Sequence, residues 1–185
     1  GVLEKIRLTA DDLVDTVENL IDLKKIEEGR MNYKFEKLDF GELVEKSAEE
    51  LRPLAAVRKL DFSVEAGTGK FFVKGDRDHL RHAVHNLIDN AVKYTPRGFV
   101  RVRAEKTGWE VILSVEDSGI GIKPGPSPLL FEEFVRDERV KSEIRGSGMG
   151  LHIVKSVVEA HGGKIWAESK GEGRGSVFSF SLPSV

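Results

Sequence analysis

The chain has 185 residues, enough for one or two domains with a hydrophobic core. With 29 Lys and Arg against 31 Asp and Glu, its net charge of −2 gives no electrostatic argument for nucleic acid or an anionic membrane as partner. The absence of cysteine excludes disulfides and thiolate metal sites, and no apolar run reaches the roughly 18 residues of a membrane span, so we expect a cytoplasmic segment. The 32% of charged residues is typical of a thermophilic source and equally of ordinary surface charge.

The first thirty residues carry a heptad pattern. Apolar residues are spaced alternately three and four apart, as in the seam of a coiled coil, at Leu3, Ile6, Ala10, Leu13, Val17 and Leu20. Leu23 and Ile26 continue an apolar face, and Gly29 stands where a helix cap is expected. Because packing supplies most of a helix's stability, this helix needs a partner. The partner is either a helix outside this chain or, alternatively, the chain's own globular part.

From residue 33 onward, strand and helix patterns alternate. We expect helices over 40–58, 76–94 and 149–163, the second stopped by the turn residues 95–98. Strands are expected at 33–40, at 59–66 and 70–76 on either side of a glycine turn, in a hairpin over 99–117, and in a closing hairpin of 164–170 and 175–183. This order predicts an α+β fold: a two-layer sandwich with a mixed sheet and about three helices, preceded by the long N-terminal helix.

The helix expected over 76–94 has an apolar and a polar stripe. The apolar stripe is Leu80, Val84, Leu87, Ile88 and Ala91, and the polar stripe is Asn86, Asn90, Lys93 and Tyr94. Asparagine is a mediocre helix former, so two of them one turn apart need a reason. One interpretation is a solvated face. The other is a Mg²⁺ site, in which amide oxygens share the metal with phosphate oxygens and water.

Two glycine-rich stretches follow this helix. Asp117 ends an apolar strand and precedes Gly119 and Gly121, and an acid there can accept a hydrogen bond from an adenine amine. The stretch "GSGMGL" (146–151) opens a helix, where backbone amides face anions. It lacks the spacing of the dinucleotide fingerprint and of the nucleotide P-loop, so neither of those loops fits.

The order of these motifs is the specific signal. The asparagine helix, the turn after Asp117, "LLFEEF" (129–134) and "GSGMGL" resemble the N, G1, F and G2 boxes of the sensor histidine kinase catalytic domain, which has the Bergerat fold and shares its superfamily with gyrase B. The resemblance covers roughly residues 38–183. Residues 8–31 resemble the second helix of the kinase dimerisation hairpin. We therefore divide the chain into residues 1–30, part of that hairpin, and residues 31–185, an ATP-binding catalytic domain.

The resemblance implies a role for each matching residue. Asn86 and Asn90 would hold Mg²⁺, Lys93 would contact phosphate and Tyr94 adenine. Asp117, beside Gly119 and Gly121, would read the adenine amine of ATP. The remaining matches are the F-box residues Phe131 and Phe134, an arginine that reaches the γ-phosphate (Arg136), and the G2 residues Gly146, Gly148, Gly150 and Leu151, which face the triphosphate. Residues 135–145 would form the lid over ATP, and Arg136 and Asn86 would be the catalytic residues.

The resemblance also implies a reaction and partners. Asn86 stands where the ATPase branch has its glutamate base, so transfer of the γ-phosphoryl group to a histidine is implied rather than rapid hydrolysis. None of the five histidines has the phosphoacceptor context; each is expected at the surface or at a helix end. A partial metal site at His79, His82 and Asn86 is a disfavoured alternative. The chain is thus expected to begin inside the hairpin, and the full protein to form a homodimer through it.

The expected partner in phosphate relay is the receiver domain of a response regulator. Two other readings stay open from the sequence. One is a superfamily ATPase or a protein-serine kinase of the anti-sigma type, which Asn86 and the hairpin-like helix disfavour. The other is a degenerate nucleotide-binding or dimerisation module, which the intact Asn90, Lys93 and Asp117 disfavour.

Overall fold

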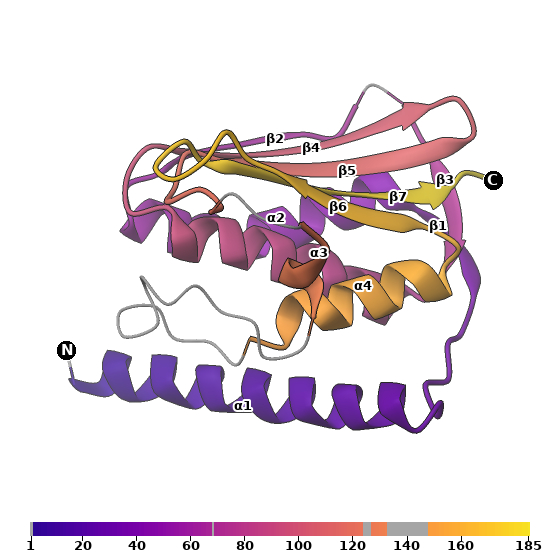
Figure 1. The fold of residues 1–185 in the computed structure, drawn as a ribbon, viewed down its shortest axis with the longest axis horizontal. Coiled ribbons are helices and arrows are strands. Elements are labelled where there is room, and N and C mark those ends of the chain that lie inside the picture. The colour runs from indigo at the N-terminus through magenta and orange to yellow at the C-terminus, as the bar shows by residue number, and fades with distance from the viewer. Residues whose placement is uncertain (1, 68, 124–126, 133–147) are drawn as a thin grey trace.

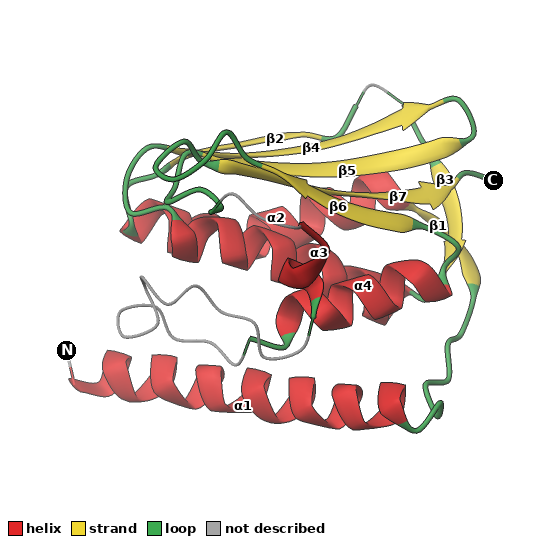
Figure 2. Ribbon diagram, in the orientation of Figure 1, coloured by secondary structure: helices red, strands yellow, loops and turns green. Residues whose placement is uncertain are grey.

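The computed structural model describes the backbone of residues 2–67, 69–123, 127–132 and 148–185. These residues form three layers (Figures 1 and 2): a sheet, a set of helices that covers one of its faces, and the long helix α1 (Val2–Glu27) on the far side of those helices. The predicted α+β sandwich with a mixed sheet and a long preceding helix is confirmed. No helix in the described part of the chain is both long and apolar enough to cross a membrane.

The main sheet has five strands in the order β2-β4-β5-β7-β6. The strands are β2 (Asp61–Glu65), β4 (Phe99–Thr107), β5 (Glu110–Asp117), β6 (Lys164–Glu168) and β7 (Ser176–Pro183). Both predicted hairpins form, since β5 pairs antiparallel with β4 and β6 pairs antiparallel with β7. The strand β2 pairs parallel with β4, so the sheet is mixed.

Three helices cover one face of this sheet: α2 (Phe40–Val57), α3 (Arg77–Tyr94) and α4 (Gly150–Ala160). Alternate residues of the strands point toward them; Val100, Val102 and Ala104 of β4 are buried, and the residues between them are exposed. Phe180 of β7 meets Phe40 of α2 edge to face, with ring centroids 5.9 Å apart. The helix layer therefore takes its position from the alternating pattern of the central strands.

The two strands on either side of the glycine turn at 67–69 do not pair with each other. The strand β3 (Phe72–Gly75) pairs antiparallel with β1 (Glu36–Asp39) in a separate two-stranded sheet, while β2 joins the main sheet. An isolated bridge from Val73 to Ser184 connects β3 to the end of the chain. The turn therefore links two sheets rather than closing a hairpin.

The helix α1 packs on the body through one side only. Leu23 is buried in the core and Asn19 is buried beside it, whereas Leu13, Val17 and Leu20 are about half exposed or more. Gly29 adopts a left-handed φ of 62° just after the helix, as the sequence predicts. Packing on the chain's own globular part therefore holds for the C-terminal half of this helix. The described portion of its heptad seam faces solvent, and a partner helix outside this chain stays a prediction.

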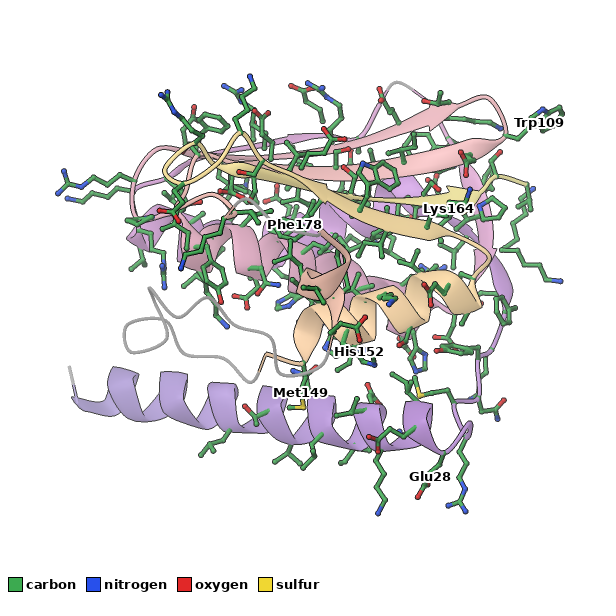
Figure 3. The ribbon with its side chains drawn as sticks, in the orientation of Figure 1. Glu28, Trp109, Met149, His152, Lys164 and Phe178 are labelled. Carbon is green, nitrogen blue, oxygen red and sulfur yellow. The ribbon has the colours of Figure 1, made fainter. Side chains whose placement is uncertain are left out.

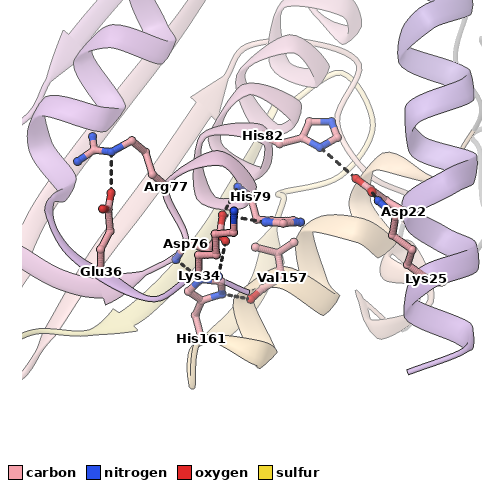
Figure 4. Close-up of polar contacts among 10 residues, drawn as sticks. All are labelled: Asp22, Lys25, Lys34, Glu36, Asp76, Arg77, His79, His82, Val157 and His161. Atoms are coloured by element: carbon pink, nitrogen blue, oxygen red, sulfur yellow. Dashed lines mark hydrogen bonds and ion pairs between the residues drawn. The ribbon is translucent and has the colours of Figure 1, made fainter. Parts of the chain in front are cut away.

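The end of α4 meets the start of α3 through a buried histidine. His161 is 6% exposed; its Nδ1–H donates to the carbonyl oxygen of Val157 at 2.7 Å, and its Nε2 accepts the backbone N–H of Asp76 at 2.9 Å (Figure 4). Burial lowers the pKa of His161, and the hydrogen bond to Val157 and the charge of Asp76 oppose this lowering only in part. We expected each histidine at the surface or at a helix end. His161 lies at a helix end, but it is buried.

His161 should make the stability of the fold depend on pH. Because its folded-state pKa lies below the unfolded value of about 6.5, the unfolded chain binds more protons below that pH, and the free energy of unfolding falls as pH falls. We expect this residue to account for a loss of up to about 2 kcal/mol between pH 7 and pH 5. Denaturant unfolding at both pH values should show a smaller loss for His161→Gln. An equal loss in the two proteins would contradict the assignment.

Candidate functional site

The polar stripe of α3 is half-buried between the neighbouring elements. The apolar stripe opposite it is buried against the sheet, as predicted, while Asn86, Asn90, Lys93 and Tyr94 are each partly covered. The helix begins at the N-cap Asp76 and is stopped after Tyr94 by Thr95, whose hydroxyl donates to the carbonyl oxygen of Ala91 at 2.7 Å. The stripe is therefore partly covered by neighbouring elements rather than fully open to solvent, which argues against the solvated interpretation.

Asn86 lies directly against the first residue of α4. A methyl group on Gly150 would lie 3.0 Å from Asn86 Oδ1, so the first box and the last box of the sequence pattern touch. The amide nitrogen of Asn86 is buried without a hydrogen-bond partner among the described residues. An unsatisfied buried polar group is costly unless a ligand or water completes it. This unpaired amide fits a site that binds a polar ligand.

Asp117 is buried at the end of β5. One carboxylate oxygen accepts the backbone N–H of Gly119 at 2.8 Å, and the other accepts the hydroxyl of Ser176. Burial raises the pKa of Asp117, and the hydrogen bonds from Ser176 and Gly119 oppose this rise. Each carboxylate oxygen has a second lone-pair direction, so the group retains capacity to accept a hydrogen bond from a ligand amine.

The turn after Asp117 approaches the end of α3 so closely that it requires glycine. A Cβ on Gly119 would lie 2.2 Å from the carbonyl oxygen of Tyr94, and that oxygen accepts the N–H of Ile120 at 3.2 Å. Gly121 has a left-handed φ of 64° and lies against the carbonyl of Gly171. The turn thus joins the acid of β5 to the helix that carries the asparagines.

Lys93 is paired in this structure with an acid that the sequence analysis did not single out. Its Nζ lies 2.7 Å from Asp89 Oδ2, one helical turn earlier on α3, and both side chains are mostly covered. An anionic ligand at Lys93 has to share the ammonium with Asp89. The pair therefore places positive charge beside Asn86 and Asn90 and balances it in the absence of a ligand.

The F-box segment is a short 3₁₀ helix, η1 (Ser127–Phe131), held against α4 and β7. Phe131 is 4% exposed, and its ring meets Phe178 edge to face at 6.4 Å. His152, on the first turn of α4, has Nδ1 3.1 Å from the carbonyl oxygen of Phe131 (Figure 3). Beside it, Met149 is buried and Leu151 packs on the core. Gly148, just before α4, has a left-handed φ of 77°.

Three predicted site residues lie outside the described residues: Phe134, Arg136 and Gly146, together with the lid expected at 135–145. The others converge from α3, the turn after β5, η1 and the start of α4.

Within the described residues, no group of three or more His, Asp or Glu side chains is placed to hold a metal ion, and His79 is bound to Asp76. The disfavoured metal site at His79 and His82 therefore has no support.

Sequence reasoning missed three residues that support this site: Ser176, Asp89 and His152. Ser176 lies 59 positions after Asp117, so no local pattern connects the two. Asp89 stands four residues before Lys93, and the spacing of opposite charges on one helix face was a usable signal. His152 follows Leu151 in a helical pattern and carries no signal of its contact with η1.

Comparison with known proteins agrees with this geometry. Residues 75–185 match the family of histidine kinase-, DNA gyrase B- and HSP90-like ATPases. The match takes in α3, the turn after β5, η1 and α4, the four elements that converge on the site. The chain belongs to this family.

Its curated relatives include sensory proteins and sensor histidine kinases. The sensory/regulatory protein RpfC of Xanthomonas campestris is 33% identical over 189 residues, which cover 98% of this chain and 26% of RpfC. The sensor-like histidine kinase SenX3 of Mycobacterium tuberculosis is 33% identical over 184 residues, which cover 98% of this chain and 44% of SenX3. The chain thus spans less than half the length of these relatives.

Solved structures of histidine kinases share the fold. Full-length ShkA, solved in complex with AMPPNP, superposes with a TM-score of 0.84 at 25% identity and covers all of this chain and 38% of its own. The mycobacterial sensor histidine kinase MprB gives a TM-score of 0.71 at 33% identity, over 82% of this chain and 98% of its own. The fold is that of the histidine kinase catalytic part.

Gly150→Ala should separate stability from ligand binding at this site. Alanine favours the helix over glycine by up to about 1 kcal/mol, while its methyl group presses on Asn86 Oδ1 at 3.0 Å. We expect an unchanged or slightly higher melting temperature together with weaker binding of Mg-nucleotide, by about tenfold. Calorimetry measures both. Wild-type affinity in a folded variant would mean that the contact between Gly150 and Asn86 does not shape the site.

Proposed function

We propose that residues 31–185 bind Mg-ATP and transfer its γ-phosphoryl group to a histidine that lies outside this chain. The observation that carries the proposal is the contact between Asn86 on α3 and Gly150 at the start of α4, beside the unpaired Asn86 amide. It brings the amide of Asn86, one of the two proposed ligands, to a helix N-terminus, and both features are suited to a metal-bound phosphate. The AMPPNP complex of ShkA supports the choice of an adenine nucleotide.

In this proposal, different side chains bind the metal, the phosphates and the adenine. Asn86 and Asn90 offer amide oxygens to Mg²⁺, which neutralises phosphate charge when bound, and Lys93 exchanges part of its pairing with Asp89 for a phosphate oxygen. The N–H groups at the start of α4 face the phosphates. Asp117, held by Gly119 and Ser176, accepts the adenine amine. We assign Tyr94 to the adenine end, and Arg136 and Gly146 to the phosphate end.

The residue types favour group transfer over hydrolysis. A hydrolytic enzyme of this superfamily needs a general base for water, and Asn86, whose amide does not titrate, stands at that position. Positioning and charge neutralisation are then the main means of catalysis. The attacking group is the imidazole of a histidine on a separate helix.

For the N-terminal segment we propose the role of the second helix of a dimerisation hairpin. Leu13, Val17 and Leu20 lie on one side of α1 and are exposed in this chain, so a helical partner can bury them. The pairing would make the full protein a homodimer. A response regulator is the proposed acceptor for relay, because the related kinase ThkA was solved in complex with the response regulator TrrA.

Asn90→Ala should weaken the Mg²⁺-dependent part of nucleotide binding. Loss of one amide ligand leaves the metal with fewer protein contacts, and we expect affinity for ATP with Mg²⁺ to fall by about tenfold or more. Without Mg²⁺ the variant and the wild type should bind alike. Titration calorimetry in the presence and absence of Mg²⁺ measures the difference. The metal assignment fails if the two proteins bind Mg-ATP equally.

Phosphoryl transfer is tested by supplying the missing acceptor. A fusion that places a first hairpin helix with its histidine ahead of residue 1 should acquire label from γ-labelled ATP, and the same fusion with that histidine replaced should not. Tight ATP binding by the fusion without any transfer would overturn the kinase proposal and leave nucleotide binding intact.

Asp117→Asn converts an acceptor oxygen into a donor, so we expect ATP affinity to fall by about ten- to a hundredfold and discrimination against GTP to be lost.

A further inference from the structure

The segment between α1 and β1 is fixed to the body although it has no regular secondary structure. Residues 31–35 form neither helix nor strand. The backbone N–H of Lys34 donates to Asp76 Oδ2 at 2.7 Å, and the ring of Tyr33 packs edge-on against His79 and His161, with centroids 4.9 and 5.3 Å away. Phe35 packs on His161 at 4.9 Å, and its ring also meets that of Tyr33 at 6.1 Å. These contacts join three elements at one place.

The two carboxylate oxygens of Asp76 accept hydrogen bonds from different parts of the chain. Its Oδ1 accepts the backbone N–H of His79 at 3.1 Å and the His79 Nδ1–H at 2.8 Å, which caps α3, while its Oδ2 takes the Lys34 N–H (Figure 4). Burial acts to raise the pKa of this carboxyl, but the hydrogen bonds from Lys34 and His79 outweigh it and bring the pKa down to about 2. The carboxylate therefore stays ionised at physiological pH.

Few of the described α1 side chains are buried. Of the α1 side chains that the structure describes, Asn19 and Leu23 are the buried ones, and Asn19 Oδ1 has no hydrogen-bond partner among the described residues, which offsets part of the gain from Leu23. His82 of α3 faces Asp22 of α1 at 3.9 Å, a distance too long for a strong ion pair, and Asp22 also pairs with Lys25. Among the contacts of the described residues, those of Tyr33, Lys34 and Phe35 join the segment after α1 to the start of α3.

We infer that Asp76, with His79 and His161, forms a joint that couples the orientation of α1 to the nucleotide-binding helix α3, and that Asp76 is a positioning residue for phosphoryl transfer. The last clause rests on the function proposed above; the joint itself does not. The cap of α3 and the anchor of the connecting segment share one carboxylate, so α1 cannot turn freely without disturbing the start of α3. Asn86 and Asn90 lie farther along the same helix.

Asp76→Asn separates the two tasks of the carboxylate. Asparagine is as good an N-cap as aspartate, so one oxygen still caps α3, while the amide NH₂ now faces the Lys34 N–H, donor against donor. The matched control is Asp39→Asn. Asp39 caps α2 through Gly41 and Glu42 and holds no connecting segment.

The orientation of α1 can be measured directly, because the chain has no cysteine. Spin labels on Glu18→Cys, exposed on α1, and Val57→Cys, exposed at the end of α2, report the distance between helix and body by pulsed electron resonance. We expect one narrow distribution in the wild type and in Asp39→Asn. In Asp76→Asn we expect a spread on the order of 10 Å, the range open to a free segment of this length. The measurement needs no nucleotide, so it stands apart from the kinase proposal.

A distribution in Asp76→Asn as narrow as that of the wild type would overturn the joint. Should Asp76→Asn fail to fold by circular dichroism, Tyr33→Ala removes the ring contacts from the segment side and must widen the distribution instead. For the positioning role, Asp76→Asn in the histidine-bearing fusion should change the rate of label transfer severalfold at unchanged affinity for Mg-ATP. Equal transfer rates with a widened distribution would overturn the positioning role and keep the joint.

Discussion

The packing of α3 against the sheet and between α2 and α4 is the constraint on which the rest of the structure depends. One side of the helix is buried in the core, and this fixes the direction in which the opposite, partly covered side points. The start of α3 holds the connecting segment through Asp76, its middle meets Gly150 through Asn86, and its last carbonyl receives the turn after Asp117. A shift of this one helix would move all three contacts together.

The chemistry of the site follows from partial burial. Asp117 is enclosed enough for its pKa to rise, yet it retains acceptor capacity because the hydrogen bonds from Gly119 and Ser176 do not use all the lone pairs of its two oxygens. Lys93 is balanced by Asp89, which keeps an ammonium stable in a mostly covered position. The unpaired amide of Asn86 has no such balance. The site therefore gives each of these charged groups a protein partner and leaves one polar group for a ligand.

Much of this arrangement could be predicted from the sequence, because it depends on local patterns. The 3.6-residue period located α3 and its two stripes, the alternation of Val100, Val102 and Ala104 located a strand with one buried face, and Gly29 marked the end of α1. The order of the motifs identified the family. The roles of the site residues remain predictions, and the lid, Phe134, Arg136 and Gly146 lie outside the described residues.

By itself, the sequence determined the elements, the polar stripe and the family, since each depends on residues within one or two turns or on motif order. The tertiary structure alone decided that β2 pairs parallel with β4 while β3 pairs with β1, that Ser176 holds Asp117, and that His161 is buried against Asp76. These contacts join residues 59 and 85 positions apart in the two polar cases. Nothing in a local pattern specifies such a pairing; it results from the way the helices and the sheet exclude water together.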